Sequence, residues 1–178
     1  MKLPWNNGVL LVAIDPAQLV TGIAWSGQDA EGKPLEGTRR FGDILDAAQL
    51  GKLLEALKTS CAFTSVRVAV EYPKWNAGAS PVVRAAANTY IRLVRSVFGS
   101  KVDVVRVDPN EWHRLFGFKD RAASQTTKDF SLHLAERVYG WVCEGQHDRA
   151  DAALILEWLK CNPVQPRTSA VKRKRKSK

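Results

Sequence analysis

Residues 8–25 read GVLLVAIDPAQLVTGIAW, and this stretch decides the fold. Its first half is an unbroken apolar run, residues 9–14, that ends in a single carboxylate, Asp15. Pro16 and a short polar break follow, and a second β-prone run covers residues 20–25. An uninterrupted apolar run between turn signals is typical of a strand buried on both faces. The pattern therefore predicts a central strand with an acid at its end and a second strand directly after it.

Asp15 has two interpretations at this point. Asp-Pro commonly initiates turns, so Asp15 could simply shape the reversal between the two strands. A charge at the end of a buried strand is costly unless something compensates it, and a metal ion is one such compensation. Asp oxygens are hard ligands of the kind that Mg²⁺ and Mn²⁺ prefer. The choice between a turn residue and a metal ligand depends on the rest of the chain.

Strands come first in the remaining sequence and then alternate with helices. Residues 35–42 predict a third strand, which would complete an antiparallel meander with the first two. Two later strands are expected over residues 66–71 and 102–107. Strands followed by alternating strands and helices predict a mixed sheet covered by helices, in a three-layer α/β domain. The expected helices cover residues 44–58 (with Asp43 as N-cap), 81–98, 110–116, 124–139 and 147–160.

Three further acids stand at positions like that of Asp15. Glu71 ends the strand over residues 66–71, and Asp148 and Asp151 open the last helix, three residues apart and so on one helix face. Two acids in a first helical turn can also simply complement the helix dipole. Four carboxylates that converge at one end of a sheet would repel one another strongly without cations. Two divalent ions about 4 Å apart would neutralise them and form a phosphodiester-cleaving site.

The charge distribution points to a polyanionic partner. The net charge is +9, and residues 167–178 carry seven positive charges and no acid, so that removing them leaves +2 for residues 1–166. We expect one folded domain over residues 1–162 and a basic, disordered tail over residues 163–178. The tail resembles a nuclear address, and a phosphate-binding arm fits it equally well.

Cysteine usage and hydropathy bear on the cellular compartment. The three cysteines, Cys61, Cys143 and Cys161, are odd in number and far apart, which predicts neither a disulfide framework nor a zinc site. No apolar run approaches the roughly 20 residues of a membrane span, and the short leader reads as the approach to a strand rather than a signal peptide. These features predict a protein of the reducing cytoplasm, without a membrane partner.

The ordered set of motifs resembles the RuvC-like Holliday junction resolvases of the ribonuclease H-like superfamily. The resemblance runs from about residue 9 to residue 160 and implies a ribonuclease H-like three-layer α/β fold, with a mixed five-stranded sheet and helices on both faces. The matching pieces are Ile14-Asp15-Pro16, Val20-Thr21-Gly22, the strand that ends in Glu71, Ser124-Gln125, and Asp148-Arg149-Ala150-Asp151-Ala152.

This resemblance implies a specific site and activity. Asp15, Glu71, Asp148 and Asp151 would form a catalytic tetrad that binds two Mg²⁺ ions per active site, with Mn²⁺ able to substitute. The activity would be that of a crossover junction endodeoxyribonuclease, which resolves four-way (Holliday) or other branched DNA junctions. It would act as a homodimer that nicks two opposed strands.

Three positions depart from the family pattern. The long loop over residues 26–34 and the basic tail also differ from the compact bacterial proteins, and they indicate a phage-type or otherwise divergent member. Ala17 stands where the family usually has Gly. Lys74 replaces a junction-contacting Phe of the bacterial proteins, and the neighbouring Trp75 either stacks on a base or packs internally. Ala123 replaces a basic residue, whose charge Arg121, Lys119 or Lys128 would supply near the scissile phosphate. The expected DNA-binding residues are Lys74, Trp75, Arg84, Lys119, Arg121, Gln125, Lys128, and Lys172, Arg173, Lys174 and Arg175 of the tail.

Other functions use parts of the same pattern. A ribonuclease H acting on RNA–DNA hybrids would use the same acids, but it would need 2′-hydroxyl recognition, for which the sequence gives no sign. A junction-binding protein with an inactive site is a non-catalytic alternative, and the presence of all four acids argues against it. An actin-like nucleotide-binding domain also begins with strand, Asp, turn and strand, but the glycine-rich phosphate loops that it needs are missing from the sequence.

Overall fold

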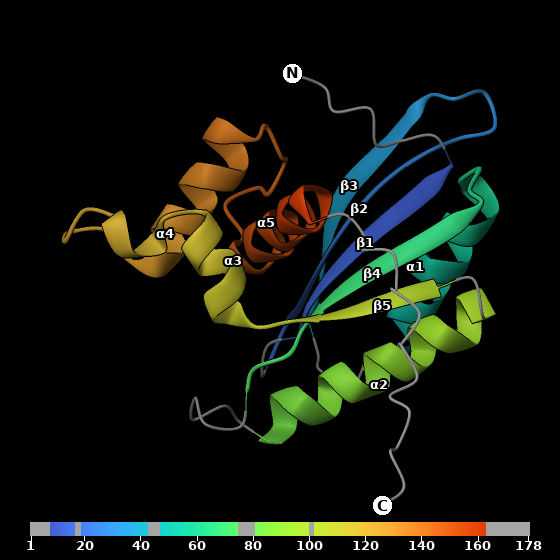
Figure 1. Ribbon diagram of the computed structural model, residues 1–178, viewed down its shortest axis with the longest axis horizontal. Coiled ribbons are helices and arrows are strands. Elements are labelled where there is room, and N and C mark those ends of the chain that lie inside the picture. The colour runs from blue at the N-terminus through green and yellow to red at the C-terminus, as the bar shows by residue number, and fades with distance from the viewer. Residues whose placement is uncertain (1–7, 17–18, 43–46, 75–80, 100–101, 163–178) are drawn as a thin grey trace, which may run out of the picture.

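A mixed five-stranded sheet forms the middle layer of the protein (Figure 1). The strand order is β3-β2-β1-β4-β5; β2 runs antiparallel to β1 and β3, while β4 and β5 continue parallel to β1. The strands are β1 (Val9–Pro16), β2 (Thr21–Gln28), β3 (Pro34–Phe41), β4 (Ser65–Glu71) and β5 (Val102–Val107). The computed structural model describes residues 8–16, 19–42, 47–74, 81–99 and 102–162.

Helices cover both faces of this sheet, as the sequence predicts. Two long helices, α1 and α2, pack on one face, and α5 packs on the other, with the shorter helices beside it (Figure 1). Within the described ranges, no helix is long and apolar enough to cross a membrane. The helices are α1 (Ala47–Ser60), α2 (Pro81–Phe98), α3 (Pro109–Leu115), the 3₁₀ turn η3 (Phe118–Asp120), α4 (Thr127–Leu132), the π-helical η4 (His133–Val138) and α5 (His147–Cys161).

The alternation of side chains along β1 determines where its terminal acid points. Leu10, Val12 and Ile14 belong to the core beneath α1 and α2, whereas Leu11 and Ala13 belong to the core beneath α5. Successive residues of a strand face opposite sides of the sheet. Asp15 therefore follows Leu11 and Ala13 and faces α5.

Small residues let α5 approach the sheet closely. Ala150, Ala152 and Ala153 of α5 are fully buried against Ala13 and Ala24 of the sheet. A Cβ atom added at Gly22 of β2 would lie 1.8 Å from the backbone carbonyl oxygen of Asp148. Glycine at this position is therefore a steric requirement for seating the first turn of α5 on β2.

The structure corrects the predicted start of one helix. The sequence places Ser124 or Gln125 at the start of the helix that continues to residue 139, but α4 begins at Thr127. Thr126 is the N-cap, because its Oγ1 accepts a hydrogen bond from the Asp129 backbone N–H at 3.1 Å. The predicted N-cap Asp43 lies outside the described residues. All three cysteines are free thiols, as predicted.

Replacement of Gly22 by alanine should destabilise the protein. The added methyl group would force α5 away from β2, and overpacking of this kind costs about 1–3 kcal/mol. We expect Gly22→Ala to lower the free energy of unfolding by about 2 kcal/mol or more in urea titrations. Gly51→Ala is the matched control, because a Cβ at Gly51 in α1 meets Leu93 at an ordinary 3.6 Å and alanine favours a helix by about 1 kcal/mol. Equal stability of the two variants would contradict the close approach.

Candidate functional site

Asp15 and Glu71 lie at the ends of two neighbouring parallel strands. Ile14 of β1 pairs in register with Val70 of β4, so the two acids that follow them stand at the same level of the sheet. Glu71 follows Ala69 in the alternation of β4, and Ala69 packs in the core beneath α5. Both carboxylates therefore face the same helix from the carboxyl ends of their strands.

The first turn of α5 adds Asp148 and Asp151 to this end of the sheet. The backbone of Asp148 lies directly over Gly22, which pairs with Asp15 in the register of β1 and β2. The negative charges of Glu71, Asp151 and Asp148 all act on Asp15. The acids predicted from sequence are thus brought to one end of the sheet from three separate elements.

Burial makes the ionised forms of these acids unfavourable. The pKa of Asp15 is raised well above its usual range, first by burial and then by the charges of Glu71, Asp151 and Asp148. Burial likewise raises the pKa of Glu71 to about 7 and that of Asp151 to about 6. Shifts of this kind, caused by burial and by neighbouring like charges, are typical of functional sites.

Trp112 and Ser131 stabilise the charged forms of two half-buried carboxylates, and sequence analysis did not identify either of them. The indole Nε1 of Trp112, in α3, donates to Glu71 Oε2 at 2.8 Å and opposes the rise in the pKa of Glu71. Ser131, in α4, has the same effect on the pKa of Asp151. Asp151 Oδ1 is buried and has no hydrogen-bond partner among the described residues. Such an oxygen is suited to bind a divalent cation.

Asp148 lies in an ion pair with an arginine. Its Oδ2 lies 3.5 Å from Nε of Arg40, which comes from the end of β3. In the part of the chain that the structure describes, no three Asp, Glu, His or Cys side chains are close enough together to hold a metal ion. The acids share one end of the sheet, and like charges oppose a tighter cluster in the absence of cations.

The structure gives the predicted DNA-binding residues different contacts. The positive charge of Lys128, in α4, opposes the rise in the pKa of Asp151, and its contact with DNA stays a prediction. Lys74 is paired with the Asp108 carboxylate at 3.0 Å. Arg84 lies 4.9 Å above the ring of Tyr72. Trp75 and the four basic residues of the tail lie outside the described residues, so their roles stay predictions.

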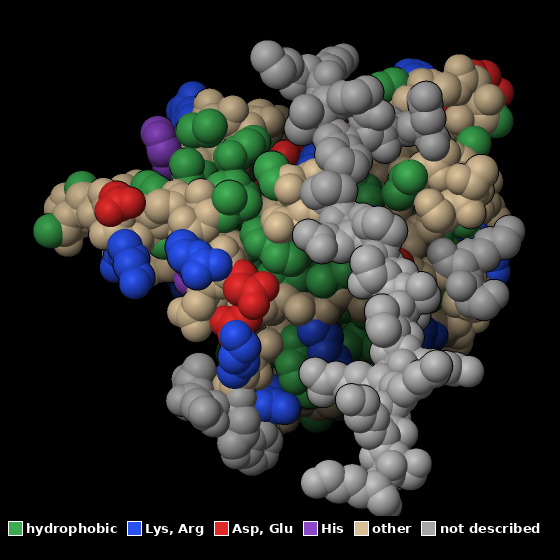
Figure 2. Space-filling view, viewed as in Figure 1, with side chains coloured by type: hydrophobic (Ala, Val, Ile, Leu, Met, Phe, Trp, Pro, Cys, Tyr) green, Lys and Arg blue, Asp and Glu red, His purple; other side chains and the backbone are tan. Residues whose placement is uncertain are grey.

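Basic side chains also gather beside the site. Figure 2 shows Lys and Arg side chains over α3 and α4. A hollow of about 430 Å³ there is lined by Arg114, Lys119 and Arg121 among others, with no acid in its lining. Arg121 also donates to the backbone oxygens of Phe118 and Gln125, which fixes the chain before α4. We predict that the basic side chains of this hollow bind the phosphate backbone of DNA.

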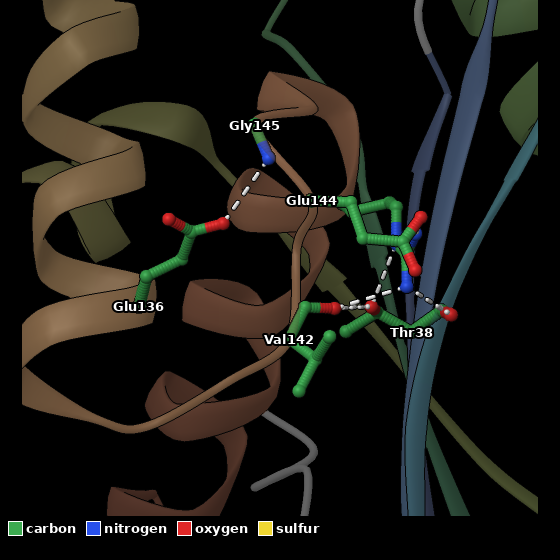
Figure 3. Close-up of polar contacts among 6 residues, drawn as sticks. Thr38, Glu136, Val142, Glu144 and Gly145 are labelled. Atoms are coloured by element: carbon green, nitrogen blue, oxygen red, sulfur yellow. Dashed lines mark hydrogen bonds and ion pairs between the residues drawn. The ribbon is translucent and has the colours of Figure 1, made fainter.

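A half-buried arginine ties the first turn of α5 to the edge strand β3. Arg149 Nε donates to Thr38 Oγ1 at 2.9 Å, and its Nη2 donates to the carbonyl oxygen of Val142 at 2.9 Å (Figure 3). Thr38 Oγ1 in turn donates to the same carbonyl at 2.7 Å. These bonds fix the position of the two aspartates that flank Arg149. Sequence analysis missed this role because the partners lie far apart in the chain.

Comparison with known proteins gives fold-level matches. No protein-family model matches the chain, and no curated protein matches it. One similar structure is Thermus thermophilus RuvC in complex with Holliday junction substrate, with 15% identity, a TM-score of 0.54, and coverage of 83% of this chain and 90% of that one. The chain has the fold of RuvC. The expected ribonuclease H-like fold is therefore confirmed, and the low identity marks a divergent sequence.

Two further structures are similar at lower scores. A second Thermus thermophilus RuvC structure has 14% identity and a TM-score of 0.49, over 85% of this chain and 95% of that one. The yeast mitochondrial Holliday junction resolvase Ydc2 has 11% identity and a TM-score of 0.48, over 82% of this chain and 75% of that one.

The raised pKa values predict an unusual pH dependence of stability. Glu71 and Asp151 bind protons more tightly in the folded than in the unfolded chain, so the unfolded chain ionises first as the pH rises. Without metal, the free energy of unfolding should therefore fall between about pH 4 and pH 7, by about 2 kcal/mol or more. Mg²⁺ or Mn²⁺ should restore it near neutral pH. Urea titrations with EDTA and with each cation would measure both effects.

The control for this test is Asp15→Asn, which removes the buried charge at the centre of the site. This variant should be more stable than the wild type without metal near neutral pH, and its stability should respond less to added cation. A wild-type stability that is unchanged across this pH interval, or insensitive to both cations, would contradict the assignment of the site.

The hydrogen bond from Trp112 should lower the pH at which the site accepts cations. In Trp112→Phe the ring is largely kept but the donor to Glu71 is lost, so the pKa of Glu71 should rise above about 7. We expect the midpoint of Mn²⁺ binding against pH, measured by calorimetry, to move to higher pH. Trp158→Phe, a change in α5 at a partly buried tryptophan of the same core, is the matched control. The same midpoint in both variants would contradict this role of Trp112.

Proposed function

We propose that this protein is a metal-dependent, structure-selective DNA endonuclease that resolves four-way or other branched junctions. The observation that carries the proposal is the gathering of Asp15, Glu71 and Asp151 at one end of the sheet, with raised pKa values in all three. A fold places buried carboxylates together at a stability cost, and such sites are commonly functional. Hard oxygen ligands at this position favour Mg²⁺ or Mn²⁺.

The chain's own residues have separate parts in this proposal. Asp15, Glu71, Asp151 and Asp148 would hold two cations, which supply Lewis acidity to the phosphate and activate the attacking water. Trp112 orients the Glu71 carboxylate through its 2.8 Å hydrogen bond. Lys128 adds positive charge beside Asp151, where a phosphate group would otherwise meet only acids. Burial of Asp15 lowers the local dielectric constant and so strengthens its interaction with a bound cation.

The proposed substrate rests on the fold and on the basic surface. RuvC, whose fold this chain shares, is described in complex with Holliday junction substrate. Here the positively charged hollow beside the acids, and the basic tail over residues 163–178, would bind the phosphate backbone of the junction arms. We further propose that residues 1–162 form the nuclease domain and that two copies act together on opposed strands. The free thiols fit a reducing cytoplasm.

Cleavage of a labelled four-way junction in Mg²⁺ tests this function. The wild type should introduce paired nicks into opposed strands and should leave linear duplex DNA and an RNA–DNA hybrid intact. Asp148→Asn should lower the rate by at least about 100-fold, because it removes a negative ligand from the site. Lys58→Gln, far away in sequence on the exposed face of α1, is the control and should cut normally.

Other outcomes separate the alternatives. Junction binding without cleavage in any divalent cation would make the protein a non-catalytic junction binder. Cleavage of the hybrid alone would keep the site and identify a ribonuclease H instead.

A further inference from the structure

Alternate residues of β3 each contact α5 or its first turn. Glu36 lies 3.7 Å from Lys160, Thr38 binds Arg149, and Arg40 lies 3.5 Å from Asp148. These three residues share one face of β3, because side chains alternate along a strand. Arg40 is the last of them and the one whose partner belongs to the acidic site.

The sheet register places Arg40 in one row with the acids. Arg40 pairs with Gly22, and Gly22 pairs with Asp15. Gly22 carries no side chain, and the backbone of Asp148 lies over it, so Asp148 stands between Arg40 and Asp15 in this row. Arg40 thus brings a positive charge to the border of the acidic site.

The contact between Arg40 and Asp148 has the features of an exchangeable ion pair. Its 3.5 Å separation exceeds the ~2.7–2.9 Å of a strong charge-assisted hydrogen bond. The Arg40 side chain is 44% exposed and that of Asp148 is 27% exposed. Ion pairs this exposed contribute about 0.2–1 kcal/mol. A divalent cation that binds Asp148 would therefore displace the guanidinium readily.

We propose that Arg40 is a phosphate-binding residue of the acidic site, held by Asp148 until a divalent cation takes that carboxylate. The displaced guanidinium then faces the site from solvent, and its planar fork of donors matches phosphate oxygens. One positive group thus balances Asp148 in the metal-free protein and binds a backbone phosphate of DNA in the loaded one. This inference rests on the proposed nuclease function and assigns a residue to its substrate contact.

The neighbouring arginine provides a matched control. Arg39 carries the same charge one residue earlier, but alternation turns it to the other face of β3, where it lies 5.5 Å from the ring centroid of Phe41. Arg39→Gln and Arg40→Gln therefore remove equal charge from opposite faces. Because both variants lose one positive charge, any difference between them is due to the position of the lost charge.

Two measurements on the full chain test the proposal. In Mn²⁺ calorimetry without DNA, Arg40→Gln should bind Mn²⁺ about 2- to 5-fold more tightly, because the competing cation is gone. In binding of a labelled four-way junction in Ca²⁺, Arg40→Gln should bind several-fold more weakly, with a salt dependence reduced by about one phosphate contact. Arg39→Gln should change neither quantity as much, and Arg40→Lys should recover part of the salt dependence.

The outcomes that overturn the proposal are distinct. Identical behaviour of Arg39→Gln and Arg40→Gln would make the contact with Asp148 an inert surface pair. Weaker Mn²⁺ binding by Arg40→Gln would show that Arg40 only positions Asp148. A wild-type protein that binds no Mn²⁺ would overturn both this inference and the proposed nuclease function, whereas the first two results leave the nuclease function intact.

Discussion

The contact between the first turn of α5 and the bare backbone of β2 at Gly22 is the constraint on which the site depends. A helix normally stands off from a sheet by the length of the side chains between them, but here glycine and alanine remove that spacing. The helix start is thereby lowered to the level where β1 and β4 end. Asp15 and Glu71 then lie close enough to the acids of α5, Asp148 and Asp151, for their charges to interact.

The close approach of α5 also makes the ionised carboxylates of the site costly for the stability of the protein. Asp15 is almost fully buried, and its pKa is raised chiefly by that burial. Trp112 and Ser131 reduce the cost for Glu71 and Asp151, yet one oxygen of Asp151 has no partner among the described residues. The fold therefore places carboxyl groups where their ionised forms lower the stability of the metal-free protein. A bound cation would remove this cost.

The positions of the acids could be predicted from sequence because they depend on local periodicity. Alternation along β1 and β4 fixes the direction of Asp15 and Glu71, and the three-residue spacing fixes Asp148 relative to Asp151. Trp112, Arg40 and Arg149 could not be predicted in the same way, because each acts through a partner on a distant element. The start of α4 was misplaced for a different reason: Ser124 and Thr126 are both good N-caps, and the contact of Thr126 with Asp129 decides between them.

Arg149 has one more consequence, for how copies of this protein can associate. It donates to the backbone carbonyl of Thr38 at 3.2 Å, on the outermost strand of the sheet, and Val142 is held against the same residue. An exposed outer strand is a template onto which another chain can add by main-chain pairing. At its middle, this template is already occupied from within the molecule. Arg149 therefore satisfies one backbone acceptor of the edge strand from within the molecule, which leaves one acceptor fewer for main-chain pairing with a second chain.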